Sequence, residues 1–237
     1  MSLTFFKMIG QLEEALGINS DDSVFDYRLY QDLINQQRVV DIRNEYNRVR
    51  TIPDSITQSI PCFEMEIVDA TTCCGEVLSG CKILRSKVPL PIPIDFHQTD
   101  GILFIKPNKI TSKPTIYVSI DRIPYISEDS LTANLLYSFI YNGYLYLYSK
   151  NSKYLLIDSV TIYGIFTDPF EAGKLGCHGE GCFDYSSEYP LSDWMWQTLT
   201  KPNVMANLMA KQFIKLDEDN NAKDDKTEQI LNPKKSK

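Results

Sequence analysis

The sequence lacks the segments that would direct the chain to a membrane or anchor it there. No apolar run approaches the ~20 residues that a bilayer-spanning helix needs. The N-terminal residues do not follow the basic, apolar and small-residue order of a secretory signal. Cysteine is also scarce, with 6 in 237 residues, which is too few for a dense disulfide scaffold. These absences predict a soluble protein with reduced thiols.

Positively charged residues are outnumbered. The chain has 24 Lys and Arg against 31 Asp and Glu, a formal net charge of −7 and a pI near 4.9. A protein that clamps nucleic acid needs a basic face, so this balance disfavours that class. DNA could still pass along an acidic wall, which would repel it. Arginines crowd the segment from Arg38 to Arg50, but the interspersed Asp41 and Glu45 favour a salt-bridged or intersubunit face there.

Familiar catalytic motifs are absent as well. The chain has no G-x-S-x-G nucleophile elbow, no phosphate-binding glycine-rich loop and no H-E-x-x-H motif. Glu64 and Glu66 fall on one face of a predicted strand, where a glycosidase could carry its acids but where solvated carboxylates are far commoner. We predict no catalytic residue and no enzyme activity. The alternative is a cell-wall hydrolase that uses Glu64, Glu66 or a thiol such as Cys177.

Thiol and imidazole side chains gather in two predicted loops. They are Cys73, Cys74, Cys81, Cys177, His178 and Cys182. Such side chains are the usual zinc ligands, and one zinc ion could join the two loops. The spacing argues against it, because no C-x2-C pair occurs and adjacent cysteines rarely both bind one ion. We therefore predict no metal ligand and no cofactor, and keep a zinc-stabilised binding module as an alternative.

Helical periodicity marks both ends of the chain. Apolar residues recur at helical spacing in Met1–Leu16. A long helix is predicted over Ser23–Val49, and Pro53 ends it. Near the C-terminus Pro190–Ile214 predicts a closing helix, which Pro202 kinks or splits. The apolar stripe of the long helix is predicted to comprise Leu29, Leu33, Gln36, Val40, Ile42, Tyr46 and Val49.

The middle of the chain has the pattern of β structure. Phe63–Ile67 alternates apolar and polar residues, as a half-buried strand does. Asn142-Gly143 lies between two aromatic-rich runs and predicts a tight hairpin, because both residues tolerate positive φ. Further strands are predicted at Lys82–Ser86, Gly101–Pro107, Lys109–Ile120, Tyr144–Tyr148, Tyr154–Ile157 and Val160–Phe166.

Together these patterns predict an α+β fold in which N- and C-terminal helices pack together around a β-rich middle portion. The predicted helical part comprises residues 1–58 and 187–215, and the β-rich insert comprises residues 59–186. From residue 216 to residue 237 the chain is polar and highly charged. Such a segment cannot bury a core by itself, so we predict a disordered tail or one that a partner orders.

Several segments carry a resemblance to a known family. They read LINQQR (33–38), RNEYN (43–47), CFEMEIVD (62–69), CC (73–74), GCKILRS (80–86), IYGIFTDP (162–169), YPLSDWM (189–195) and DNNAKD (219–224). In pattern and order they resemble the ring or adaptor proteins of the virion neck in crAss-like bacteriophages and related short-tailed phages. The resemblance covers most of residues 30–225 and includes no catalytic signature.

This resemblance implies a structural virion protein that is made in the host cytoplasm and acts as a head-to-tail connector. Such proteins form homo-oligomeric rings, commonly twelvefold, stacked beneath the portal protein and next to other tail or ring proteins. They seal the neck while DNA passes as cargo, and they have no catalytic residues to transfer to this chain. A large β portion departs from the small adaptors, which are mostly helical. In this setting the alternative enzyme would be a virion-associated cell-wall hydrolase.

Overall fold

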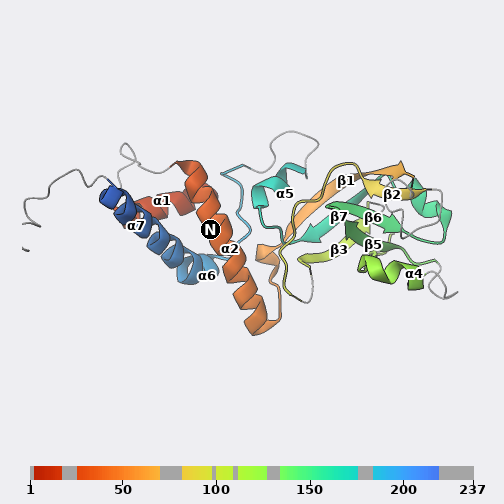
Figure 1. Cartoon of the computed structure of the whole chain (residues 1–237), viewed down its shortest axis with the longest axis horizontal. Coiled ribbons are helices and arrows are strands. Elements are labelled where there is room, and N and C mark those ends of the chain that lie inside the picture. The colour runs from red at the N-terminus through yellow and green to blue at the C-terminus, as the bar shows by residue number, and fades with distance from the viewer. Residues whose placement is uncertain are drawn as a thin grey trace, which may run out of the picture.

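The computed structural model describes residues 3–17, 26–69, 82–97, 100–108, 112–126, 134–175 and 184–218. The molecule is elongated, with α1, α2, α6 and α7 at one end of its long axis and a curved β-sheet, beside which the short α4 lies, at the other (Figure 1). The predicted α+β class is therefore confirmed. No helix in the described ranges combines the length and apolar character that crossing a bilayer would require.

The helical end is built from both ends of the chain. Helix α1 (Phe5–Leu16) begins at Thr4, whose hydroxyl accepts a hydrogen bond from Lys7 N, and ends at Gly17 in the left-handed conformation. Helix α2 (Tyr27–Val49) and helix α7 (Lys201–Glu218) pack with it. Their apolar side chains form one buried cluster, as expected for amphipathic helices that cover one another's apolar faces.

Helix α2 differs from its prediction in two respects. It begins at Tyr27, with Asp26 as the capping residue, whereas part of the predicted first turn lies outside the described residues. Its buried face is also rotated from the predicted stripe, because Gln36 and Val40 are exposed. The residues buried on α2 are Tyr30, Leu33, Ile34, Arg38, Asp41 and Ile42. Two charged residues therefore occupy the middle of its packed face.

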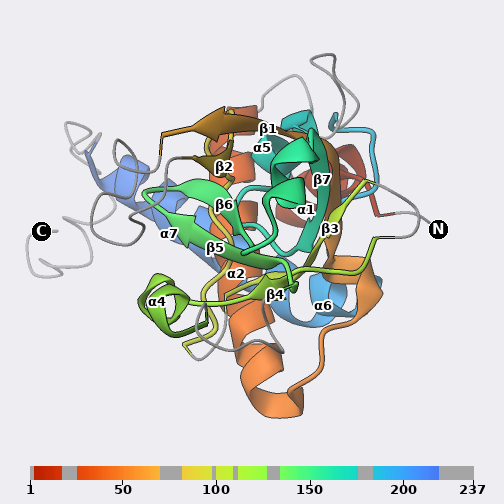
Figure 2. The ribbon, with the colours of Figure 1, turned by 90° about the vertical axis from the view of Figure 1, so that its right-hand side faces the viewer.

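The sheet curls into a nearly closed barrel, seen along its axis in Figure 2. Within the described residues it has seven strands in the order β3-β7-β1-β2-β6-β5-β4, and each pair except β4–β5 is antiparallel. Thr115 N donates to Ile105 O at 2.7 Å and so connects the two outer strands. The strands are β1 (Gln58–Val68), β2 (Ile83–Ser86), β3 (Ile102–Pro107), β4 (Ile116–Tyr117), β5 (Tyr137–Tyr141), β6 (Tyr144–Tyr148) and β7 (Ser159–Gly164).

Alternation along the strands fills the barrel interior with apolar side chains. Ile60, Phe63, Leu147 and Ile162 are almost completely buried there, and burying each such side chain contributes about 1.5–3 kcal/mol. The predicted hairpin is confirmed, with Asn142 and Gly143 both at positive φ between β5 and β6. A bulge in β1 near Cys62, at φ 54°, shifts the register against β7 and helps the sheet to curl.

One predicted strand is much shorter than expected and another is wrong. The Lys109–Ile120 segment forms strand only at Ile116–Tyr117, with residues 109–111 outside the described ranges. Tyr154–Ile157 lies largely in a 3₁₀ turn, because Asn151 caps the segment by accepting from Lys153 N. The remaining short elements are η2 (Asp54–Ile56), η3 (Ile120–Arg122), α4 (Ile123–Ile126), η4 (Ser152–Leu156) and α5 (Pro169–Leu175).

The C-terminal helical run is continuous but irregular. Ser192 caps α6 (Asp193–Met195) by accepting from Met195 N at 3.2 Å. A wider π-helical turn, η5 (Trp196–Thr200), follows and leads into α7. The predicted disturbance at Pro202 takes this form, because proline lacks an N–H and crowds the carbonyl one turn earlier. Helix α7 runs to Glu218, beyond the predicted end of this helix at Ile214, and residues 219–237 lie outside the described ranges.

Candidate functional site

A buried arginine lies where the helical end meets the barrel. Arg38 on α2 is fully buried. Its Nε donates to Pro190 O at 2.9 Å, its Nη1 to Phe166 O at 2.8 Å and its Nη2 to Ile56 O at 3.5 Å. These carbonyls belong to the segments that enter β1, leave β7 and lead into α6. One side chain therefore binds α2 to three separate parts of the chain.

The surroundings of Arg38 are unusual for a buried cation, because the three acceptors of its hydrogen bonds are neutral carbonyl oxygens. Burial lowers the pKa of the Arg38 guanidinium, and the nearby Tyr189 and Asp168 act in the opposite direction. Its guanidinium carbon lies 5.8 Å from the centre of the Tyr189 ring, which adds a cation–π contact. Because arginine stays protonated in proteins, the charge must be stabilised locally by these groups.

Further polar contacts extend this junction along α2. Asn35 donates to Asp168 Oδ1 at 3.3 Å and accepts from Tyr189 Oη at 2.6 Å. The carboxylate of Asp41, which is also buried, accepts from Thr200 Oγ1 at 2.7 Å and from Gln37 Nε2 at 2.8 Å. Buried polar groups of this kind are stabilising only when their bonds are made. The network therefore fixes one orientation of α2 against the barrel and the C-terminal segment.

The helical end carries an open groove where α2 stops. It has a volume of about 280 Å³. Trp194 and Val49 line it with 52% and 45% of their surface exposed. We name it the helix-end groove, and its lining comprises Glu45, Val49, Thr51, Ile52, Pro53, Ser192, Trp194 and Met195. An exposed tryptophan beside an apolar hollow is typical of the central part of a protein interface.

An exposed aromatic patch lies where α2 starts. Phe6 and Tyr27 are each about half exposed, and their ring centres are 6.4 Å apart in an edge-to-face arrangement. Tyr185 contacts Phe6 with centres 5.6 Å apart. We name these three residues the aromatic patch. Because α2 has 23 residues, the patch and the helix-end groove lie about 35 Å apart along the helix.

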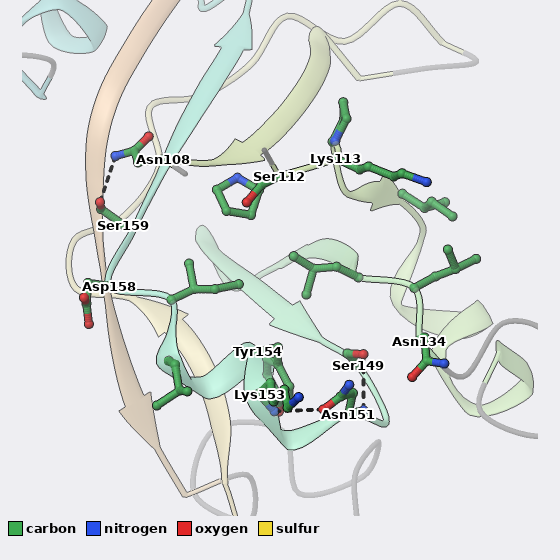
Figure 3. A pocket seen from close by; sticks show the side chains of 17 residues that line it. Asn108, Ser112, Lys113, Asn134, Ser149, Asn151, Lys153, Tyr154, Asp158 and Ser159 are labelled. Atoms are coloured by element: carbon green, nitrogen blue, oxygen red, sulfur yellow. Dashed lines mark hydrogen bonds between the residues drawn. The ribbon is translucent and has the colours of Figure 1, made fainter. Parts of the chain in front are cut away.

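A larger groove lies at the barrel end remote from the helices. It has a volume of about 870 Å³. Its walls come from the end of β3, the segment around β4 and the η4 turn (Figure 3). We name it the barrel-end groove. Its lining comprises Pro107, Asn108, Ser112, Lys113, Pro114, Ile116, Asn134, Leu135, Leu136, Ser149, Asn151, Lys153, Tyr154, Leu156, Ile157, Asp158 and Ser159.

The two glutamates named as alternative catalytic acids lie on the outer face of the sheet. Glu64 pairs with Lys87 at 2.8 Å, and Glu66 pairs with Arg85. Arg85 also stacks over the Tyr144 ring at 4.8 Å, and neither glutamate lines either groove. The hydrogen bond and charge of Glu64 raise the pKa of Lys87. Cross-strand ion pairs account for both acids without a catalytic role.

The predicted Cys and His cluster cannot be placed, since Cys73, Cys74, Cys81, Cys177, His178 and Cys182 all lie outside the described residues. Within the described ranges no group of three or more His, Cys, Asp or Glu side chains could hold a metal ion. The expected absence of a metal site therefore stays a prediction.

Comparison with known proteins identifies the family. A family model described as phage tail ring protein 2 matches residues 7–226. This chain belongs to that family. A relative named Ring protein 2, from Bacteroides phage crAss001, is 31% identical over 244 residues, which cover 94% of this chain and 98% of the relative. The resemblance to crAss-like phage ring proteins is confirmed.

Membership of the phage tail ring protein 2 family places this chain among structural ring proteins of phage particles. Family membership agrees with the prediction of a non-enzyme. The surfaces that such a protein uses for assembly are therefore more relevant than its pockets.

The sequence analysis did not predict that Arg38 is central to the junction. Ile34, Arg38 and Ile42 recur at i, i+4 and i+8, so Arg38 had to lie on the buried side of α2 once its two apolar neighbours did.

Proposed function

We propose that this chain is a head-to-tail connector that assembles into a closed, dodecameric ring beneath the portal, joins capsid to tail and surrounds the DNA exit channel. The observation that carries the proposal is the family match over residues 7–226. The activity resides in surfaces between copies and toward neighbouring layers. A net charge of −7 suits a wall that DNA passes without binding, because phosphates are repelled by it.

The two ends of α2 supply the surfaces that such a ring needs. A ring requires heterologous contacts, in which each copy uses two different patches. The helix-end groove, with Trp194, and the aromatic patch, with Phe6 and Tyr27, are two such surfaces at opposite ends of one stiff helix. We infer that the patch of one copy meets the groove of the next.

The remaining parts of the chain then have separate tasks. The helices predicted at Ser23–Val49 and Pro190–Ile214 build the ring wall, and the β-rich insert, residues 59–186, contacts an adjacent tail or ring component. The buried Arg38 network supports this division because it holds the barrel at a defined angle to the wall. The polar tail from residue 216 reaches a neighbouring copy.

Assembly of the purified chain tests the proposal. Mass photometry across protein concentrations, with and without the portal, should detect ring-sized particles for the parent. Trp194→Ala and Phe6→Ser should each abolish these particles while the free energy of unfolding stays within about 0.5 kcal/mol of the parent, since both side chains are half exposed. Leu103→Ser, which changes a similarly exposed residue of β3 outside both surfaces, is the matched control.

Two outcomes would contradict the proposal. A parent chain that stays monomeric at every concentration, and that binds neither portal nor neighbouring tail proteins, excludes a ring role. Full assembly by the Trp194 and Phe6 variants would leave the ring possible but would overturn the contact proposed between the two ends of α2. A cryo-electron-microscopy image of an assembled particle would then give the true contact and the number of copies.

A further inference from the structure

The barrel-end groove combines exposed apolar residues with two lysines. Leu156, Ile116 and Leu135 present 69%, 42% and 38% of their surface to solvent in its walls. Lys113 enters from the segment before β4 and Lys153 from the η4 turn on another wall (Figure 3). The ion pairs found within the described residues include neither lysine. A groove of this composition suits a short segment with acids beside apolar side chains.

The sequence beyond α7 contains such a segment. Among residues 219–237, Ile230-Leu231 is the one adjacent apolar pair. Acidic residues precede it at Asp219, Asp224, Asp225 and Glu228, against two lysines in the same stretch. In the eight residues from 224 to 231, the acidic residues therefore come first and the apolar pair follows.

We propose that the barrel-end groove receives residues 224–231 of a second copy of this chain. Ile230 and Leu231 cover the exposed apolar surface around Leu156, and the preceding acids face Lys113 and Lys153. This inference rests on the proposed ring, because a neighbouring copy must present its tail. The tail thereby binds the barrel-end groove, which takes no part in the proposed contact between the two ends of α2.

The place where α7 ends favours a neighbour over the same copy. Helix α7 ends at Glu218, at the opposite end of the long axis from the barrel (Figure 1). The docked segment begins at residue 224, so the free connector comprises residues 219–223 and spans at most about 18 Å when fully extended. To reach its own groove the tail would have to double back along the whole molecule. A second copy in a stacked layer, with its barrel beside the end of α7, would present the groove within that reach.

The contact need not be strong as an isolated interaction. Tethering within a ring raises the effective concentration of the tail to the millimolar range for a short flexible connection. A weak groove therefore becomes occupied once copies assemble, while separate copies do not aggregate through it. This behaviour would couple tail docking to completion of the ring.

A peptide-binding assay tests the proposal without the need for ring assembly. A fluorescent peptide of residues 219–237 is titrated with the full chain carrying Ile230→Ser and Leu231→Ser, so that its own tail does not compete. We expect saturable binding by fluorescence anisotropy. Leu156→Glu in the protein should weaken it by about tenfold or more, since one leucine-sized apolar contact is lost. Ile92→Glu, which changes a residue 66% exposed outside the groove, is the matched control and should change nothing.

Charge reversal tests the second half of the proposal. Lys113→Glu with Lys153→Glu should weaken peptide binding several-fold at low salt, and a peptide with Asp224→Lys and Asp225→Lys should recover part of the loss. Lys150→Glu, an exposed lysine just outside the groove, is the control. No binding of the parent peptide, or binding that ignores the Leu156 change, overturns the inference.

Crosslinking in assembled material identifies which copy supplies the tail. A benzophenone residue replaces Leu156 in an isotopically labelled population, which is mixed with an unlabelled parent before assembly and irradiation. Mixed-isotope crosslinks to residues 224–231 are expected. Crosslinks confined to one copy, or to the portal alone, overturn the inference while the ring stands. Peptide binding by a chain that never forms rings would instead contradict the proposed function.

Discussion

The barrel and the helical end of this protein are stabilised in different ways. Strands β1 and β7 bury apolar side chains in near-alternation and satisfy their backbone groups in the sheet ladder. The helical end also has an apolar cluster, but the packed face of α2 carries Arg38 and Asp41 at its centre. The barrel is thus stabilised chiefly by burial, whereas the junction depends on directional bonds that only one arrangement satisfies.

This difference bears on how a ring protein is built. Apolar packing tolerates small shifts, while a guanidinium bound to carbonyls of three segments does not. A ring component must present surfaces at a fixed angle in every copy. The polar junction suits that need better than a purely apolar interface would, at the expense of greater sensitivity to substitution.

The largest effect is expected at the junction. Arg38→Met should lower the free energy of unfolding by about 3–5 kcal/mol, because the Phe166 and Pro190 carbonyls lose their donor inside the protein. Chemical denaturation followed by tryptophan fluorescence measures it. Arg43→Met is the control, since Arg43 donates to Asp95 O at an exposed position, and it should cost under about 1 kcal/mol. Equal effects of the two variants would refute a special role for the junction.

A cavity in the barrel should have the next largest effect. Ile162→Ala on β7, which is fully buried, should lower the unfolding free energy by about 2–5 kcal/mol. Hydrogen exchange should then report faster opening of β1 and β7. Ile67→Ala on β1, half exposed, is the matched control. If helical amides are destabilised as much as barrel amides, the two ends unfold as one cooperative unit and the contrast between them is structural only.

Removal of the hydrogen bond between Asp41 and Thr200 should lower the free energy of unfolding by a smaller amount. Thr200→Val keeps the side-chain shape but leaves a buried carboxylate oxygen without its hydroxyl donor. The expected cost is about 1–3 kcal/mol. Thr167→Val, which removes a hydroxyl bonded to Ile92 O at an exposed site, should cost less than about 0.5 kcal/mol. Thermal unfolding of the pair decides whether burial of the polar contact matters.

The smallest effect concerns alkaline pH. Burial raises the pKa of Tyr154 to about 12, and the neighbouring Tyr148 adds to the shift; an unfolded tyrosine has a pKa near 10. The folded state therefore gains stability from the neutral phenol below pH ~10, and loses it as pH rises toward 12. Tyr154→Phe should flatten this part of the pH profile of unfolding. Tyr125→Phe, at a highly exposed residue, should leave the profile unchanged.

Particular elements show which features were predictable from the sequence. Helix α1, strand β3 and the β5–β6 hairpin lie where periodicity and the Asn142-Gly143 turn predicted them. The 3₁₀ turn at Ser152–Leu156 was missed because an apolar-rich run outweighed the capping Asn151 in the prediction. The grooves escaped prediction entirely, since each joins residues that are far apart in the sequence.

Three features follow from the sequence: the α+β class, the helical ends around a β-rich middle, and the resemblance that the family match confirms. Those features follow from local periodicity, turn residues and the order of segments. Three features depend on the tertiary structure: Arg38 is buried at the junction, Glu64 and Glu66 are paired on the outer face, and the sheet curls into a nearly closed barrel. These features depend on which distant segments pack together, because that packing decides whether a side chain is buried and which groups it contacts.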